Sequence, residues 1–449
     1  MRELTRAMME YSWAMSLFGA RQFENLLLPR GRRGDPTDEA AASLYTVSVA
    51  TQNQFDSLLQ GAFQAGDQLQ RGIVDVMFDL LTFKSFDPDN PNNLQGLSAD
   101  ATQQTEETFR VLISERNIRL AWRELQNKLR VFQMVQDART TLKITSETYI
   151  PLLESVRRAY DAGPYPALWL IEGLGHDYTD TFWNRGETPR DILTQGIARR
   201  LPGKSLTMLH AGLGLSIAQR LLKDLTPQSS PREARSVIRE FIELCDANAR
   251  EGYVGAAYES LGLVTRTFFP PLVGVVERAL RELDEEVLAY FWHGVGRALY
   301  FSAVYFIPGL LSPWIALDRE APYELARLNV VAGITWAIVE VNINDPEVME
   351  NTLRFQGERI SHDGAFANGV SSGVIMRYDT TPDADFTFEW CRHEPDGSDP
   401  DLARLWRRQV SGPCRDALEW FYPVLKRRGR LGEVFRYQPL RDLVEELEW

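Results

Sequence analysis

Cysteine is scarce in this chain of 449 residues, and the few cysteines follow no recognisable pattern. Cys245, Cys391 and Cys414 are odd in number and widely spaced, and no Cys-x-x-Cys pair occurs. A zinc knuckle or a disulfide framework needs closely spaced pairs, so the sequence argues against both kinds of site. This use of cysteine fits a reducing compartment, and we therefore expect a cytoplasmic protein.

Sequence signatures of several enzyme classes are also missing. The chain has no Walker-type phosphate loop, no Gly-x-Ser-x-Gly elbow, no His-Glu-x-x-His zinc motif and no aspartate-rich motif of terpene cyclases. Gly173-Leu-Gly175 lacks the third glycine of a dinucleotide fingerprint and follows no clear strand. The sequence thus points to no metal and leaves the cofactor unknown, and whether the protein is an enzyme stays open.

Basic residues are outnumbered by acidic ones. The formal net charge is −13 and the isoelectric point is about 5.1. An extended acidic surface repels phosphate backbones, so we expect no nucleic-acid partner. The 44% hydrophobic and 25% charged residues are typical of a globular protein. A chain of this length is expected to form two or more cores or one elongated array.

Long apolar runs are few. Charges at Arg2 and Arg6 interrupt the stretch that a signal peptide would need. Residues 298–317 run for 20 residues without a charge, but Pro308 and Pro313 lie within them. A proline-interrupted run favours a buried helix followed by a loop over a membrane-spanning helix.

What the chain does contain is a recurring glycine, often within a Gly-apolar-Gly triplet. Successive members are separated by 39, 40, 42, 39 and 40 residues. They are Gly173, Gly212, Gly252, Gly294, Gly333 and Gly373. A fixed period of this size is typical of stacked helix pairs. Because glycine destabilises a helix by about 0.5–1 kcal/mol relative to alanine, its repetition needs a reason. Two explanations of the repeated glycine stay open, which are close packing of helices and room for a ligand.

We predict an all-α fold with three parts. Residues 1–97 carry amphipathic helical periodicity and form an N-terminal helical pair, which ends at a linker rich in asparagine and proline. Residues 98–147 form a connecting helical segment, and residues 148–449 form an α/α helical-repeat domain with units of about 40 residues. Ser230-Pro231 and Asp345-Pro346 are expected helix starts, with a capping residue before a proline.

Glu172, His176 and Asp180 form the strongest candidate for chemistry. Their spacing of four residues places them on one face of an α-helix. A carboxylate, an imidazole and a second carboxylate can relay protons or ligate a metal ion. We name these three as candidate catalytic residues. The alternative is structural, with Glu172 paired to Arg297.

Other polar and aromatic residues cluster around the repeated glycines. In a regular solenoid, residues that flank equivalent glycines project to equivalent places on one surface, which predicts a groove lined by titratable groups. Aromatic neighbours of such a groove could contact an apolar ligand. The candidate substrate-binding residues are His210, Glu251, Trp292, His293, Arg297 and Tyr300.

The glycine motifs resemble an uncharacterised family encoded in enediyne antibiotic gene clusters. The resemblance covers roughly residues 150–390 and rests on four segments. They are Ile171-Glu-Gly-Leu-Gly, Leu209-His-Ala-Gly-Leu-Gly-Leu-Ser-Ile-Ala, Arg250-Glu-Gly-Tyr-Val-Gly and His293-Gly-Val-Gly-Arg-Ala-Leu-Tyr-Phe. The resemblance implies a context in secondary metabolism and assigns no catalytic residue. The N-terminal helices, around Ala62-Phe-Gln-Ala-Gly-Asp-Gln-Leu-Gln-Arg71, are similar to phasins, which coat polyester granules.

The sequence therefore predicts an accessory protein of natural-product biosynthesis that binds, and in one version transforms, a hydrophobic intermediate in a helical groove. Two alternatives stay open. One is an interaction scaffold whose groove receives a partner helix or whose N-terminal pair drives homo-oligomerisation. The other is a protein that coats a lipid or granule surface through residues 1–80.

Overall fold

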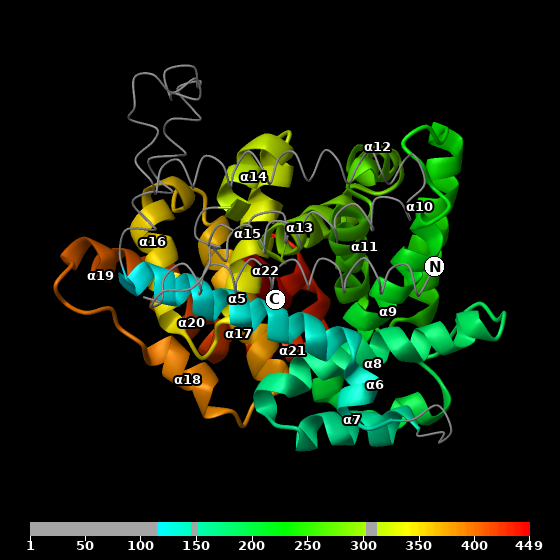
Figure 1. Ribbon diagram of the computed structural model, residues 1–449, viewed down its shortest axis with the longest axis horizontal. Helices are drawn as coiled ribbons and strands as arrows, with labels where there is room; N and C mark the ends of the chain where they lie inside the picture. The colour runs from blue at the N-terminus through cyan, green and yellow to red at the C-terminus, as the bar shows by residue number, and fades with distance from the viewer. Residues whose placement is uncertain (1–114, 145–150, 302–311) are drawn as a thin grey trace, which may run out of the picture. The chain divides into compact units, whose positions relative to one another are not determined.

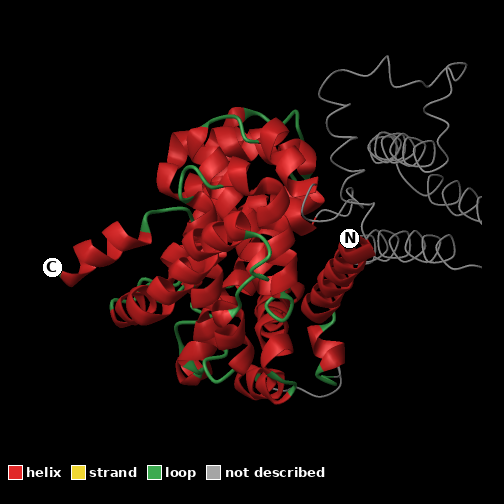
Figure 2. Cartoon of the chain, turned by 90° about the vertical axis from the view of Figure 1, so that its left-hand side faces the viewer, coloured by secondary structure: helices red, strands yellow, loops and turns green. Residues whose placement is uncertain are grey.

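The computed structural model describes residues 115–144, 151–301 and 312–449. Every regular element within these ranges is helical, and no strand occurs in them (Figure 2). The predicted all-α class is confirmed. The expected N-terminal pair, residues 1–97, lies outside the described residues, and so does the proposed domain boundary at residue 97.

Six helices form the centre of the described region, and each packs against the next in chain order. Figure 1 shows four of them, α9, α11, α13 and α15, following one another from right to left. The six are α8 (Pro164–Asn184), α9 (Leu206–Leu222), α11 (Val254–Phe268), α13 (Glu285–Phe301), α15 (Glu324–Val341) and α17 (Ala365–Thr380). This order reproduces the stacked helices that the glycine period predicted.

The helices that connect the six central ones lie at the periphery of this row. Helix α5 (Glu115–Gln136), which precedes the row in the chain, packs on α8 and α15. Short helices α6 (Ala138–Thr141) and α7 (Leu152–Asp161) follow α5. The peripheral helices are α10 (Pro231–Asn248), α12 (Val273–Leu283), α14 (Ser312–Glu320) and α16 (Pro346–Ile360). Helices α10 and α16 begin at the two prolines predicted as helix starts. Ser230 and Glu233 form a capping box on α10.

The central helices are buried on nearly every side. All residues of α13 from Val287 to Phe301 are buried, as are all residues of α15 from Asn329 to Val341. A helix that is buried all round must satisfy its polar side chains inside the protein, because water does not reach them. Charged side chains on these helices therefore meet other central helices.

Glycines allow the central helices to approach one another closely. A Cβ atom added at Gly212 on α9 would overlap the carbonyl oxygen of Glu172 on α8. The same holds for Gly294 against Glu259 and for Gly333 against His293. Of the two explanations for the repeated glycine, the structure thus supports close packing.

One member of the predicted period does not belong to it. Gly252 lies in a turn before α11 with φ of +81°, a left-handed conformation that favours glycine. The packing glycine of α11 is Gly262, where a Cβ atom would overlap the carbonyl oxygen of Phe291. The even spacing around Gly252 was therefore fortuitous.

The C-terminal part adds short helices around α17. They include α18 (Asp385–Arg392), α19 (Pro400–Trp406), α20 (Gly412–Asp416), α21 (Tyr422–Arg427) and α22 (Leu440–Glu448). A π-helical turn, η6 (Arg407–Ser411), joins α19 to α20, and a second, η7 (Ala417–Phe421), joins α20 to α21. A short 3-10 helix, η8 (Leu431–Phe435), precedes α22. Within the described residues, no helix is both long and apolar enough to cross a membrane.

Candidate functional site

Arg297 on α13 lies at the centre of a buried ion-pair cluster. Its Nη2 donates to Glu172 Oε1 on α8 at 3.0 Å, and its Nη1 donates to Glu259 Oε2 on α11 at 2.9 Å. The guanidinium lies over the Trp336 ring of α15, 4.5 Å from the ring centroid. Burial disfavours the charge of Arg297, but Glu259 and Glu172 outweigh that effect and raise its pKa. One side chain thus joins four central helices.

His293 extends the cluster one helical turn before Arg297. Its Nδ1 lies 3.3 Å from Glu259 Oε1, and both side chains have no exposure to solvent. Burial lowers the pKa of His293, which favours the neutral imidazole. The neutral ring then donates from Nδ1 to the carboxylate, and its Nε2 has no partner among the described residues.

Arg377 and Glu340 form a second buried pair next to the first. Arg377 Nη2 on α17 lies 2.8 Å from Glu340 Oε2 on α15 and also donates to the Glu340 carbonyl oxygen at 2.7 Å. Burial raises the pKa of Glu340 to about 7, although Arg377 and Arg297 oppose the shift. A carboxyl group that titrates near neutral pH therefore lies inside the protein.

The cluster has a clear structural role. Removing one partner of a buried ion pair leaves an uncompensated charge, which costs about 3–5 kcal/mol. The Glu172–Arg297 pairing considered from the sequence is confirmed. Glu259, Glu340 and Arg377 were missed, although Glu259 stands three residues before the packing glycine Gly262.

His176 and Asp180 belong to a different environment from Glu172. His176 Nε2 lies 3.0 Å from Gln219 Oε1, and its Nδ1 lies 4.0 Å from oxygens of both Asp177 and Asp180. Burial opposes protonation of His176, but the two carboxylates and Gln219 outweigh it and raise its pKa. The side chain is 23% exposed. The three predicted catalytic residues are thus divided between a sealed interior and a solvent-accessible helix face.

His210 and Glu251 do not line a groove. His210 is fully buried, its Nδ1 donates to the Leu206 carbonyl oxygen at 2.6 Å, and its Nε2 accepts from the Arg250 amide at 2.9 Å. Burial lowers its pKa to about 4, so the ring is neutral and both nitrogens are satisfied. Glu251 is exposed in the turn before α11, because Gly252 is not a helical glycine.

Trp292 and Tyr300 are packing residues of α13. Trp292 Nε1 donates to the hydroxyl of Tyr323 at 2.9 Å, and Tyr300 accepts from Asn342 Nδ2 at 2.8 Å. Each is only 1% exposed. The six predicted substrate-binding residues are therefore five buried side chains and one exposed turn residue, and they share no open groove.

An open cleft of about 560 Å³ lies elsewhere, where the first turns of α13 and α15 meet the chain after η8. Ala289, Leu325 and Leu328 give it an apolar wall. Three carboxylates surround this wall, those of Glu285, Glu286 and Glu324. Acidic residues favour the first turn of a helix because the helix dipole is positive there, which explains their position.

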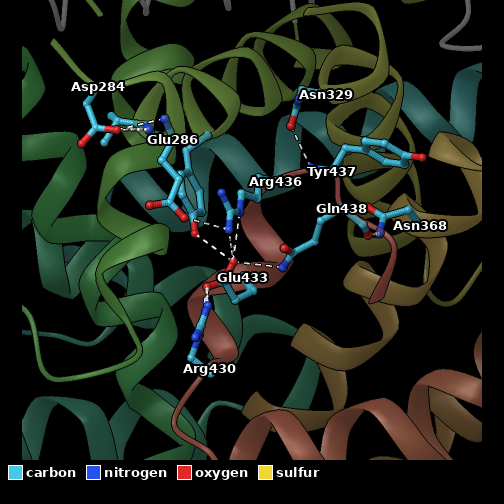
Figure 3. Close-up of polar contacts among 11 residues, drawn as sticks. Asp284, Glu286, Asn329, Asn368, Arg430, Glu433, Arg436, Tyr437 and Gln438 are labelled. Atoms are coloured by element: carbon cyan, nitrogen blue, oxygen red, sulfur yellow. Dashed lines mark hydrogen bonds and ion pairs between the residues drawn. The ribbon is translucent and has the colours of Figure 1, made fainter. Parts of the chain in front are cut away.

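Arg436 and Tyr437, which follow η8, also line the cleft, and Figure 3 shows their polar contacts. Arg436 Nη2 lies 3.0 Å from Glu286 Oε1, and its Nε donates to Glu433 Oε2 at 2.9 Å. The Tyr437 amide donates to Asn329 Oδ1 on α15 at 2.7 Å. The one cation of the lining is thus already paired with two carboxylates, so the cleft keeps a negative potential.

No group of three or more His, Cys, Asp or Glu side chains within the described ranges is arranged to hold a metal ion. Comparison of the chain with family models, curated proteins and solved structures found no match.

Proposed function

We propose that the protein binds an apolar molecule that carries a basic group, and that the cleft between α13, α15 and η8 is its binding site. The observation that carries the proposal is the combination of an apolar wall with an excess of carboxylates around it. Ligand sites are concave and mostly apolar, with a few polar groups that fix orientation. The cleft has this composition.

The charge of the ligand follows from the pairing inside the cleft. Arg436 is held by Glu433 and Glu286, whereas Glu324 has only a loose contact of 3.9 Å with Arg327. An added cation would face the exposed carboxylates of Glu285 and Glu324. An added anion would face the same carboxylates and be repelled.

The biological setting of this proposal is the one that the enediyne-cluster resemblance implies. The protein would be a cytoplasmic accessory protein of natural-product biosynthesis that holds a hydrophobic intermediate. The proposal places binding at the cleft and assigns no chemical step, because Glu172 is sealed in an ion pair away from the solvent-accessible His176 and Asp180.

A titration with three probes of equal chain length tests the proposal. Octyltrimethylammonium, 1-octanol and octanoate share an eight-carbon chain and differ in charge. We expect the cation to bind most tightly, the alcohol less tightly and the anion least tightly, with the advantage of the cation shrinking as salt is added. Leu328→Gln should weaken the binding of all three probes, since it removes part of the apolar wall.

Two results would reject the proposal. If octanoate binds as tightly as octyltrimethylammonium, the carboxylates do not select the ligand. If Leu328→Gln leaves every affinity unchanged, the probes bind outside the cleft.

The scaffold and surface-coating alternatives remain predictions. Both rest on residues 1–97, which lie outside the described residues. The version in which a partner helix enters the glycine-lined groove is not supported, because His210, His293 and Arg297 are buried among the central helices. Deleting residues 1–97 should abolish self-association or surface attachment under these alternatives and leave the cleft intact.

A further inference from the structure

Five polar side chains in the protein interior each keep a nitrogen or oxygen atom that has no hydrogen-bond partner among the described residues. They come from three central helices, α13, α15 and α17, and together they are called the interior polar site. The atoms are His293 Nε2, Arg297 Nε, Trp336 Nε1, Glu340 Oε1 and Arg377 Nε. None of the five residues is more than 1% exposed, so bulk water does not reach these atoms. Unpaired buried polar atoms are strongly unfavourable, so the site requires further partners.

The five side chains are neighbours in space. The ring centroid of Trp336 lies 6.4 Å from that of His293 and 4.5 Å from the central carbon of the Arg297 guanidinium. Glu340 follows Trp336 by one turn of α15 and therefore lies on the same face of that helix. Glu340 Oε2 in turn lies 2.8 Å from Arg377 Nη2. The site is thus continuous from His293 to Arg377.

The interior polar site is enclosed by central helices. Arg297 reaches Glu172 on α8 and Glu259 on α11, and Arg377 Nη1 donates to the Tyr165 carbonyl oxygen of α8 at 3.4 Å. Helix α17 also contacts α8 and α9. The row of central helices therefore closes on itself, with the interior polar site on its inner side.

The contacts made by the protein itself leave both donors and an acceptor over. Arg297 and Arg377 use their Nη atoms for Glu172, Glu259, the Tyr165 carbonyl oxygen and Glu340, and the Nε–H group of each guanidinium remains. A carboxylate accepts several hydrogen bonds, yet only Arg377 lies within ion-pair distance of Glu340. A water molecule satisfies such a mixture, because it both donates and accepts.

We propose that the interior polar site binds ordered water molecules, which bridge the Glu340 carboxylate to the N–H groups of Arg297, Arg377 and Trp336. His293 donates from Nδ1 to Glu259, so its Nε2 is an acceptor and receives a hydrogen bond from one of these waters. None of the five residues lines the cleft of the proposed function, so the two proposals stand or fall separately.

The direct test is a crystal structure of the full-length chain at a resolution that shows ordered water. We expect one water within hydrogen-bond distance of Glu340 Oε1 and of Arg297 Nε or Arg377 Nε, and one on His293 Nε2. The proposal is overturned if both Nε atoms pair directly with Glu340, or if no water lies within hydrogen-bond distance of these atoms.

Radiolytic labelling tests the same claim in solution on the wild-type protein. Radicals formed from a bound water oxidise the side chain beside it, even where bulk water has no access. Trp336 should be oxidised several-fold faster than Trp406, which is also 0% exposed but whose Nε1 donates to the His393 carbonyl oxygen. Equal oxidation of the two tryptophans would reject a water site beside Trp336.

Two variants of Glu340 show whether its carboxylate holds the water. Glu340→Gln keeps an acceptor oxygen, so Trp336 should be oxidised as fast as in the wild type. Glu340→Met has a similar length but no such oxygen, so oxidation of Trp336 should fall several-fold while that of Trp406 stays unchanged. If both variants label Trp336 like the wild type, Glu340 does not bind the water and the proposed bridge is wrong. The wild-type measurements decide the proposal even if Glu340→Met does not fold.

Discussion

The guanidinium of Arg297 and the carboxylate of Glu172 lie 3.0 Å apart in the protein interior, although 125 residues separate them in the chain. Each residue stands next to a glycine that lets its helix approach a neighbour. Gly173 lets α8 approach Val135 on α5, and Gly296 lets α13 approach Val330 on α15, so the two glycines help to fix the helices that carry the charges. The cluster around Arg297 is therefore a feature of how the central helices pack, and its removal should affect stability first.

Replacement of Arg297 by methionine should destabilise the protein by about 3–5 kcal/mol, because Glu172 would lose the partner of its buried charge and Glu259 would keep only His293. The free energy of unfolding in urea measures the effect. The matched control is Arg427→Met, which removes a 3.7 Å pair with Glu448 between side chains that are 61% and 45% exposed. The control should cost less than about 1 kcal/mol.

A triple variant separates the pairing of the charges from the packing of the side chains. Glu172→Gln and Glu259→Gln added to Arg297→Met replace the whole charged group, and such replacements are often close to neutral. The triple variant should recover part of the lost stability. If it is as unstable as Arg297→Met alone, uncompensated charge is not the cause.

Gly262→Ala should destabilise the protein by about 1–3 kcal/mol, because the new methyl group would overlap the backbone of Phe291 on α13. Thermal unfolding followed by circular dichroism measures the change. Gly274→Ala on the exposed side of α12 is the control, since the nearest atom there is the flexible end of Arg278 at 3.4 Å. It should stabilise by about 0.5–1 kcal/mol. Equal effects at the two positions would contradict the packing role.

Glu340→Gln should change how stability depends on pH. The folded pKa of Glu340 is about 7, above its ordinary value of 4.5, so between these values the folded state holds more protons than the unfolded state. The contribution of Glu340 to the free energy of unfolding is fully present below pH 4.5 and is lost as the pH rises to 7. A glutamine side chain at this position does not titrate, so the variant should not lose stability in this way.

The measurement for Glu340 is the difference in unfolding free energy between the variant and the wild type. It should shift in favour of the variant by on the order of 3 kcal/mol as the pH rises from 4.5 to 7. Because the substitution also alters the contact with Arg377, the absolute difference is not diagnostic, and only its slope with pH is. A difference that is flat across this window would show that Glu340 titrates normally.

The stacked helices could be predicted from the sequence because close packing demands glycine at the contact points. Which glycines make the contacts could not be predicted, since Gly252 fits the spacing and lies in a turn, whereas Gly262 breaks the spacing and packs. Spacing alone does not say where a helix begins. The partner Glu259 was missed for the same reason.

Two features of the C-terminal region depend on the tertiary packing. The sequence Ser411-Gly-Pro413 is typical of a helix break, but the chain stays helical there through the π-helical turn η6, which accommodates the proline. An acidic stretch such as the one after Tyr378 is typical of an exposed surface, but Asp379 is buried and accepts from Lys426 Nζ at 2.6 Å. In both places distant partners decide the outcome.

The cleft also could not be predicted, because its walls are far apart in the chain. Tyr437 and Asn329, which meet at 2.7 Å, are 108 residues apart. In the sequence, the acidic residues of the cleft have the pattern that is common in the first turn of any helix. Nothing in the sequence relates them to Arg436.

The most direct test of the proposed function compares two neutralising variants with the octyltrimethylammonium probe by titration calorimetry. Glu324→Gln changes a carboxylate of the cleft, and Glu446→Gln changes an exposed carboxylate on α22 with the same change of net charge. We expect the cleft variant to bind the cation about two- to fivefold more weakly and the control to bind like the wild type. Equal affinities for the cation in both variants would contradict the proposed binding site.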